Sequence, residues 1–246
     1  MADSRAWEGV AMTAAVVVAG GRGVRMGLDL PKQFAEVLAK PILVYTLESL
    51  ERQPEIEKYL VVVRAEYRDL VLDYAQKYGL SKFAGTTMAG STCQESIRNG
   101  VYAFQGELGA DDLLLVTDAI RPYVAAEVYS DVIEKARLYG NGITSLPYNC
   151  QICYIDDEVS AIRHLDRKTV KRIASPQCYR YGKLLELYQK AYSDGIAISG
   201  DDYANSLYTA YGERIYFAKG SEKNIKLTTP EDMEIFRAFL QAGITR

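Results

Sequence analysis

Residues 14–27 of the chain read AAVVVAGGRGVRMG. The segment begins with an apolar run that contains consecutive valines, which is typical of a β-strand buried on both faces. Gly20 and Gly21 then interrupt that run. Because glycine lets backbone amides approach an anion closely, the segment predicts a buried strand followed by a phosphate-binding turn.

Further apolar runs alternate with helical patterns along the chain. Buried strands are expected at 59–63 and at 113–116, the latter ending in Thr117-Asp118, and helices over 42–50, 69–78, 95–104 and 125–139. This alternation predicts an α/β fold with a single Rossmann-like, doubly wound and mostly parallel sheet. Ligands of such sheets bind beyond the carboxyl ends of the strands. We therefore expect Gly20, Arg64 and Asp118 at the functional edge.

The pattern then changes to that of an inserted β-hairpin. Residues 151–154 and 159–164 predict two short strands joined by the turn 155–158, which together form an arm at about 147–167. The later elements expected are a helix over 183–192, a polar loop at 199–202, a strand at 214–218 and a helix over 230–240 with Thr229 as cap. We predict one domain over 14–243 with this arm, preceded by an extension at 1–13; Met12 is an alternative start.

Composition excludes several classes of protein. The chain has 246 residues, is 48% hydrophobic and carries 29 basic and 32 acidic residues, a net charge of −3. Neither nucleic-acid nor membrane binding is expected from this balance, and no apolar run reaches the roughly 18 residues of a membrane span. The single histidine, His164, excludes multi-histidine metal centres, and we expect it on the arm. Catalysis is expected to rely on groups other than histidine.

The cysteines are Cys93, Cys150, Cys153 and Cys178, and 150–153 form a C-x-x-C pair. A zinc or redox site is one interpretation of such a pair, but zinc would need two further ligands at suitable spacing. We interpret the pair as packed, reduced thiols on a strand. Reduced thiols and the absence of a recognisable targeting pattern lead us to expect a cytoplasmic protein.

The glycine turn is distinctive because basic residues cluster beside it. It is not a Walker A loop, and Met26 stands where a dinucleotide-binding fingerprint has its third glycine. Arg64, instead of an acidic residue, follows the second strand, which also disfavours a hydride-transfer enzyme. Arg22, Arg25 and Lys32 suit a triphosphate. The alternative is a surface turn with solvated charges.

Residues 19–27, followed by Leu30-Pro31-Lys32-Gln33-Phe34, resemble the signature of the cytidylyltransferases that act on polyol phosphates. These are 2-C-methyl-D-erythritol 4-phosphate cytidylyltransferase and its ribitol 5-phosphate relatives. The resemblance continues in the order of that family through Ser96 with Asn99-Gly100, 117–122, Asp166-Arg167, Ser175-Pro176-Gln177 and 224–232. It therefore covers nearly the whole chain.

The resemblance implies transfer of CMP from CTP to a polyol phosphate with release of pyrophosphate. Such chemistry depends on positioning and on neutralising charge, which lysine, arginine and Mg²⁺ supply. The implied catalytic residues are Lys32, Arg25 and Lys226; the nucleotide-binding ones are Ala19, Gly20, Gly21, Gly23, Gly90, Ser96 and Asp118; and the acceptor-binding ones are Asp118, Arg121, Gln151, Arg167, Ser175 and Gly200. Asp118 is also the implied metal contact. Arg167 corresponds to an arginine that reaches the neighbouring subunit's substrate, which implies a homodimer formed through the arm.

The chain departs from the methylerythritol pattern at several positions. Cys93-Gln94-Glu95 replaces an acid–arginine pair, and Thr117 replaces a histidine. Gln151 and Gly200 stand where the family has threonines that contact the polyol. The expected acceptor is of the methylerythritol 4-phosphate type, and ribitol 5-phosphate or another polyol or sugar phosphate is the alternative that these departures leave open. A catalytically weak nucleotide-binding relative is the other hypothesis.

Overall fold

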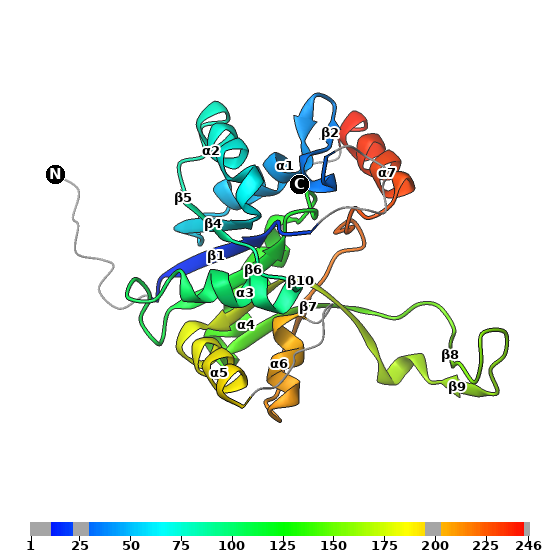
Figure 1. Ribbon diagram of the computed structural model, residues 1–246. Helices are drawn as coiled ribbons and strands as arrows, with labels where there is room; N and C mark the ends of the chain where they lie inside the picture. The colour runs from blue at the N-terminus through cyan, green and yellow to red at the C-terminus, as the bar shows by residue number, and fades with distance from the viewer. Residues whose placement is uncertain (1–10, 22–29, 195–202, 244–246) are drawn as a thin grey trace.

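A computed structural model describes residues 11–21, 30–194 and 203–243. Strands from these residues form a seven-stranded sheet in the order β11-β7-β10-β6-β1-β4-β5 (Figure 1). Their bounds are β1 Thr13–Val18, β4 Lys58–Val63, β5 Phe83–Met88, β6 Leu113–Asp118, β7 Asn141–Pro147, β10 Lys171–Arg180 and β11 Phe217–Lys219. Within the sheet β10 is antiparallel to both of its neighbours, and the other pairs are parallel. The mostly parallel α/β sheet is therefore confirmed.

The register of the central strands brings their carboxyl ends to one edge. Val18 of β1 is opposite Asp118 of β6 and Val62 of β4. Backbone hydrogen bonds continue just past the strand ends, from Ala19 N to Val62 O at 2.8 Å and from Ala89 N to Val63 O at 2.9 Å. The turns that follow β1, β4, β5 and β6 consequently lie side by side at this edge.

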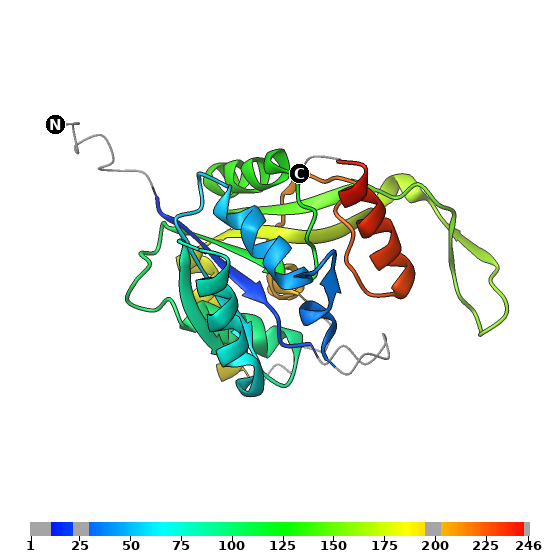
Figure 2. The ribbon, with the colours of Figure 1, turned by 90° about the horizontal axis from the view of Figure 1, so that it is seen from above.

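Helices cover both faces of the sheet, because alternate residues of each buried strand face opposite sides. Ala15 and Val17 of β1 pack with α1 (Ile42–Glu51), α2 (Arg68–Lys77) and α4 (Ala126–Tyr139). The opposite face packs against α3 (Cys93–Tyr102), α5 (Tyr181–Ser193) and α6 (Ala204–Ala210). Figure 1 shows α1 above and α3 below β1, and Figure 2 views the α1 side with α7 (Pro230–Gln241) beyond it.

Helix α3 packs directly on the sheet at Gly100, where a side chain would not fit. A Cβ at this position would lie 2.5 Å from Val16 Cγ1 and 3.0 Å from Val62 Cγ2. Thr92 caps the helix by accepting a hydrogen bond from Glu95 N at 3.1 Å, so the helix begins before the predicted residue 95. This contact between helix and sheet places the first turn of α3 beside the ends of β1 and β5.

The predicted arm is present as β8 (Ile152–Tyr154) and antiparallel β9 (Arg163–Leu165), and it projects from the body of the protein (Figure 1). The prediction of a strand over 159–164 was wrong in extent, because residues 159–162 belong to the connecting loop. Asp157 Oδ1 accepts from Val159 N at 2.8 Å, and Asp156 Oδ2 accepts from Ile162 N at 2.7 Å. These side chains take the backbone donors that a longer strand would use.

Several elements had no clear pattern in the sequence. These are β5, β7, β10, α6 and the short pair β2 (Glu36–Val37) and β3 (Lys40–Pro41). The predicted strand at 214–218 is β11, shifted to 217–219, whereas the cap at Thr229 is confirmed by its bond from Asp232 N at 3.3 Å. Residues 1–10 and the loop 199–202 lie outside the described residues. No helix in the described part is long and apolar enough to cross a membrane.

Candidate active site

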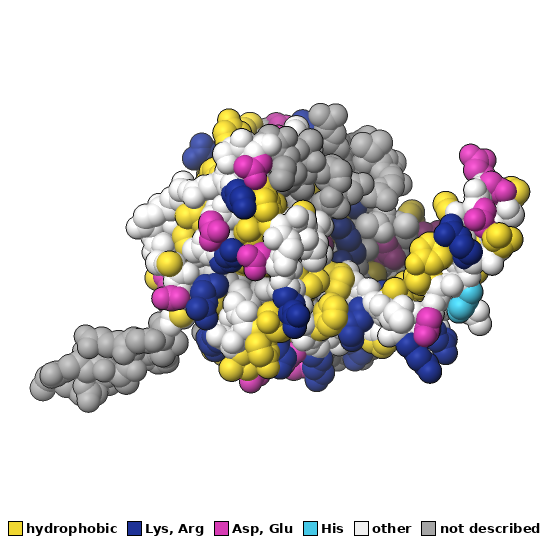
Figure 3. Space-filling view, turned by 90° about the horizontal axis from the view of Figure 1, so that it is seen from below, with side chains coloured by type: hydrophobic (Ala, Val, Ile, Leu, Met, Phe, Trp, Pro, Cys, Tyr) yellow, Lys and Arg dark blue, Asp and Glu magenta, His cyan; other side chains and the backbone are white. Residues whose placement is uncertain are grey.

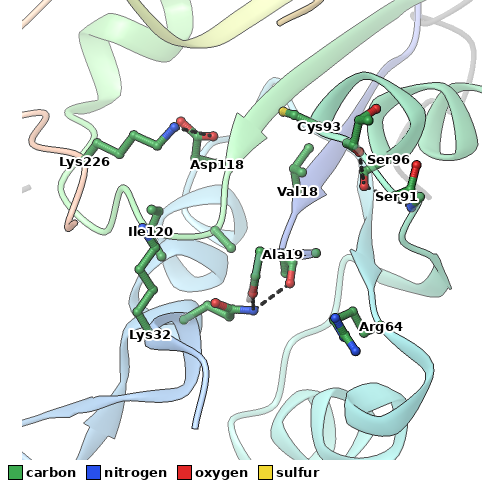
Figure 4. A pocket seen from close by; sticks show the side chains of 16 residues that line it. Val18, Ala19, Lys32, Arg64, Ser91, Cys93, Ser96, Asp118, Ile120 and Lys226 are labelled. Carbon is green, nitrogen blue, oxygen red and sulfur yellow. Dashed lines mark hydrogen bonds and ion pairs between the residues drawn. The ribbon is translucent and has the colours of Figure 1, made fainter. Parts of the chain in front are cut away.

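A cleft of about 320 Å³ opens at the carboxyl edge of the sheet (Figure 4). Its floor is formed by the glycine turn after β1, and its walls by the segments that follow β4, β5 and β6. The lining includes the predicted residues Ala19, Gly20, Gly21, Lys32, Gly90, Ser96, Asp118 and Lys226. The structure therefore brings together most of the predicted nucleotide-binding residues.

Gln33 holds the described part of the glycine turn in place. Its Nε2 donates to Ala19 O at 2.7 Å and to Gly21 O at 3.0 Å, and its side chain is buried. Gln33 lies in the short 3-10 turn Lys32–Phe34, which also directs buried Lys32 into the cleft. No role was predicted for Gln33, although it belongs to the Leu-Pro-Lys-Gln-Phe motif.

The opposite end of the cleft is organised by Ser96. Its hydroxyl accepts from Gly90 N at 3.0 Å and donates to Thr92 O at 2.9 Å. Gly90 must be glycine here, because a Cβ would lie 2.2 Å from Glu95 Cβ. Hydrogen bonds from Ser91 keep the pKa of Glu95 below its usual value. Ser96 thus shapes the loop between β5 and α3 as well as lining the cleft.

Arg64 also lines this cleft, and no functional role was predicted for it. It follows β4, between the glycine turn and the β5–α3 loop, and its Nε donates to Glu66 Oε1 at 2.6 Å. Figure 4 shows Arg64 and Lys32 on opposite sides of the cleft. The described cations of the cleft, Lys32, Arg64 and Lys226, therefore surround it from separate segments of the chain.

Asp118 forms the centre of a buried polar cluster at the end of β6. Its Oδ2 accepts from Arg121 Nε at 2.9 Å and from Ser175 Oγ at 3.0 Å, and its Oδ1 lies 3.6 Å from Lys226 Nζ. Burial alone would raise the pKa of Asp118. The charges of Arg121 and Lys226, with the hydrogen bonds from Arg121 and Ser175, outweigh burial and lower that pKa. Asp118 is accordingly a carboxylate at neutral pH.

A second cleft of about 240 Å³ adjoins the first and shares Asp118 and Lys226 with it. Arg121, Ser175 and Gln177 also line it. The carboxy-terminal segment closes this region, because Arg121 Nη1 donates to Asn224 O at 3.0 Å and Asn224 Nδ2 donates to Ser175 O at 2.7 Å. These contacts explain how Lys226, remote in sequence, comes to stand between the two clefts.

A family model for 2-C-methyl-D-erythritol 4-phosphate cytidylyltransferase matches residues 13–242. The chain belongs to this cytidylyltransferase family. Among curated relatives, a ribitol-5-phosphate cytidylyltransferase of Lacticaseibacillus paracasei is 42% identical over 94% of this chain and 98% of its own. A 2-C-methyl-D-erythritol 4-phosphate cytidylyltransferase of Clostridium novyi is 32% identical over 92% of this chain and 96% of its own. The predicted resemblance is confirmed.

Solved structures support the fold assignment. The 4-diphosphocytidyl-2C-methyl-D-erythritol synthase of Anaerococcus prevotii superposes with a TM-score of 0.78 at 24% identity, covering 94% of this chain and 96% of its own. Another 4-diphosphocytidyl-2C-methyl-D-erythritol synthase gives the same TM-score at 25% identity and covers 94% of this chain and 99% of its own. The sheet and helices described above are thus the fold of the cytidylyltransferase family.

Gln94, one of the residues that departs from the methylerythritol pattern, has a structural role in this cytidylyltransferase. Gln94 is buried between helices; its Nε2 donates to Tyr203 O at 2.8 Å, and its Oε1 accepts from Tyr188 Oη at 2.7 Å. It therefore anchors the start of α6 to α3 and α5. Thr117 is buried in β6, and its hydroxyl has no hydrogen-bond partner among the described residues. Cys93 lines the first cleft.

Two predicted acceptor-binding residues of the cytidylyltransferase lie outside both clefts. Gln151 and Arg167 are exposed residues of the arm, where Arg167 Nη1 donates to Asn149 O at 3.1 Å. His164 is exposed in β9, as expected. The prediction of packed thiols was wrong for Cys150 and Cys153, because the thin hairpin has no core and leaves both exposed. The predicted Arg22, Gly23, Arg25 and Gly200 fall outside the described residues.

The side chains of the clefts fit a metal ion that is held chiefly by the phosphates of a bound molecule and only in part by the protein. No group of three or more His, Cys, Asp or Glu side chains that could hold a metal occurs in the described part of the chain. Asp118 offers one carboxylate whose Oδ2 is already engaged by Arg121 and Ser175. Mg²⁺ commonly binds through one or two carboxylates together with phosphates and water, and this site meets that requirement.

Proposed function

We propose that this cytidylyltransferase transfers CMP from CTP to a polyol phosphate, forming a CDP-polyol and pyrophosphate. The observation that carries this proposal is the pair Asp118–Lys226, which forms the wall shared by two adjoining polar clefts. A transfer between two phosphates requires both at one point, and Lys226 Nζ stands at that boundary. The relatives named above support the reaction class.

The first cleft suits the nucleotide in one orientation. Its α-phosphate must approach the second cleft, so the cytosine would lie at the far end, beside Gly90 and Ser96. Lys32 would contact the triphosphate and stabilise charge that builds up on the α-phosphate during transfer. This orientation leaves the glycine turn beneath the phosphates, where its amides are most useful.

The second cleft suits the acceptor phosphate. Arg121 is oriented by Asp118 and Asn224, so its guanidinium has a defined position in the cleft wall. An acceptor phosphate oxygen attacks the α-phosphorus, and the bond from that phosphorus to the oxygen bridging to the β-phosphate breaks as pyrophosphate leaves. Lys226 neutralises charge on both phosphates, and no step needs a histidine.

Mg²⁺ would be held by Asp118 Oδ1 together with the phosphates of CTP. When bound, it supplies positive charge to the phosphate oxygens and to the departing pyrophosphate. Asp118 keeps its negative charge for this role because Arg121 and Lys226 lower its pKa. Lys226 and the metal ion would then share the same carboxylate.

We propose ribitol 5-phosphate as the preferred acceptor. The relative named for ribitol 5-phosphate is more similar to this chain than the Clostridium novyi relative named for methylerythritol 4-phosphate. The second cleft is lined largely by polar side chains, among them Ser175, Gln177, Asn205 and Ser206. Such a lining suits an unbranched chain of hydroxyls better than one that carries a methyl branch.

We also propose that the arm forms a homodimer. Hydrophobic side chains gather along it (Figure 3), and Ile155, Val159 and Ile162 are 81%, 94% and 90% exposed. An arm without a core of its own gains stability by covering these residues with a second copy of the chain. In such a dimer Arg167 and Gln151 could complete the partner's acceptor site.

Because the reaction consumes CTP, we place the enzyme in the cytoplasm.

Pyrophosphate release tests the activity. The purified chain is incubated with CTP, Mg²⁺ and either ribitol 5-phosphate or 2-C-methyl-D-erythritol 4-phosphate, with Lys32→Ala as the inactive control. We expect turnover with both CTP and an acceptor present, at least tenfold greater kcat/KM for ribitol 5-phosphate, and loss of turnover when EDTA removes the metal. Tight CTP binding without turnover on any polyol phosphate would instead identify a nucleotide-binding relative.

A further inference from the structure

Asn205 lines the second cleft from α6, in the same cleft as the charged residues that we assign to the acceptor phosphate. Asp118, Arg121 and Lys226 supply the charges of this cleft, and Asn205 belongs to its uncharged part together with Gln177. An acceptor whose phosphate binds at these charges therefore shares the cleft with the two amides. No role was predicted for Asn205 from the sequence.

A chain of hydrogen bonds determines which way the Asn205 amide points. Gln177 Nε2 lies 3.2 Å from Ala174 O, a carbonyl oxygen that can only accept, so the amide nitrogen of Gln177 must face it. Gln177 Oε1 then accepts from Tyr179 Oη. The same Gln177 Nε2 also lies 3.0 Å from the Asn205 side chain, and a donor there requires the Asn205 oxygen, Oδ1, to face it.

The amide nitrogen of Asn205 is consequently turned away from Gln177. Asn205 is partly buried, and its Nδ2 has no hydrogen-bond partner among the residues that the structure describes. We infer that Asn205 is a specificity-determining residue that donates a hydrogen bond from Nδ2 to a hydroxyl oxygen of the acceptor polyol. This inference rests on the proposed function. Gln177 is the positioning residue that keeps the donor aimed at the acceptor.

Helix α6 is held firmly enough to present this donor. Ala204 and Leu207, one residue before and two residues after Asn205, are buried in the core. Tyr203 O, just before the helix, accepts from the buried side chain of Gln94 at 2.8 Å. A donor fixed by a packed backbone and by an oriented amide loses little freedom on binding, so its hydrogen bond discriminates well between acceptors.

Because an amide N–H left unpaired in a closed site is costly, an acceptor lacking the matching hydroxyl should react about 10- to 100-fold less efficiently.

The test compares ribitol 5-phosphate with its monodeoxy analogues, one for each hydroxyl, by pyrophosphate release. In the wild type, kcat/KM should fall about 10- to 100-fold for the analogue that lacks the hydroxyl bound by Asn205.

Asn205→Asp keeps the oxygen that faces Gln177 and replaces the hydrogen-bond donor of the amide with an acceptor. In this variant, kcat/KM for ribitol 5-phosphate should exceed kcat/KM for that same monodeoxy analogue by only about threefold or less. KM for CTP should stay within about twofold of the wild-type value.

Two further variants complete the test. Gln189→Glu makes the same amide-to-carboxylate change at an exposed position of α5 and should leave every preference unchanged. Asn205→Ala removes the donor without adding charge and should reproduce the loss of preference. A wild type that is active but shows the same analogue preferences as Asn205→Asp and Asn205→Ala would overturn the inference alone. A wild type inactive with every polyol phosphate would overturn the proposed function, and the inference with it.

Discussion

Lys226 Nζ lies 3.6 Å from Asp118 Oδ1, although the two residues are far apart in the sequence. The ion pair joins the last residue of β6 to the segment before α7. It also lies in the lining that the first and second clefts share. In the mechanism that we propose, the site works through fixed charges instead of proton relays, so phosphoryl chemistry is compatible with a chain that has a single histidine.

Replacing Asp118 should destabilise the protein. Asp118→Asn leaves the buried guanidinium of Arg121 without its carboxylate, which should lower the free energy of unfolding by about 3 kcal/mol or more in urea melts at pH 7. Asp111→Asn breaks an exposed pair with Arg180 and should cost less than about 1 kcal/mol. Equal losses for the two variants would contradict the importance of the buried cluster.

The same pair predicts a pH dependence. The pKa of Asp118 is lowered in the folded protein, so its contribution is fully present above the ordinary carboxyl value of about 4 and is lost as pH falls through the lowered value. The stability difference between wild type and Asp118→Asn should therefore be constant above about pH 5 and shrink below about pH 4. A difference that grows in acid would reverse the expected sign.

Lys32→Ala should affect turnover far more than nucleotide binding. Lys32 is buried in the cleft, and a charge that acts mainly on the transition state contributes to kcat. We expect kcat to fall by about 100-fold or more and KM for CTP to change by about fivefold or less. Lys40→Ala, whose ammonium pairs with Glu48, serves as the control and should retain activity. Equal losses in kcat and CTP affinity would argue for a binding role only.

Gln33→Leu should weaken CTP binding. The variant is similar in size but loses both hydrogen bonds that hold Ala19 O and Gly21 O, so the glycine turn should lose its preferred geometry. We expect KM for CTP to rise by about 10-fold with a smaller change in kcat, measured by pyrophosphate release. Gln76→Leu, at an exposed position of α2, is the matched control. An unaltered KM would show that the turn keeps its shape without Gln33.

Mixed dimers test whether the arm reaches the partner's site. Lys32→Ala and Arg167→Ala chains, each inactive alone, are combined by refolding and separated by distinct affinity tags. If Arg167 serves the partner's acceptor site, each mixed dimer contains one site with both residues intact and should recover about half of the wild-type activity per dimer. Purified mixed dimers without any recovery would place Arg167 in its own chain's site.

The sequence by itself determined three central strands of the sheet and the edge where the candidate site lies. Uninterrupted apolar runs at 14–19, 59–63 and 113–116 can be stable only as buried strands, and their polar ends follow directly in the chain. Local patterns also determined the cap at Thr229 and the existence of the arm. The family motifs identified Lys32, Asp118, Arg121, Ser175 and Lys226, which the structure places at the two clefts.

Only the tertiary structure decided which strands pair and which side chains hold the site residues in position. Strand β10 mixes charged, polar and apolar residues, so its place between β6 and β7 depends on pairing with residues far away in the chain. The support given by Gln33 to the glycine turn, and by Gln177 to Asn205, consists of hydrogen bonds between side chains and atoms whose proximity no local pattern records. Hydrophobic periodicity reports which face of an element is buried. The direction of a side-chain amide depends on the donors and acceptors that the completed fold places around it.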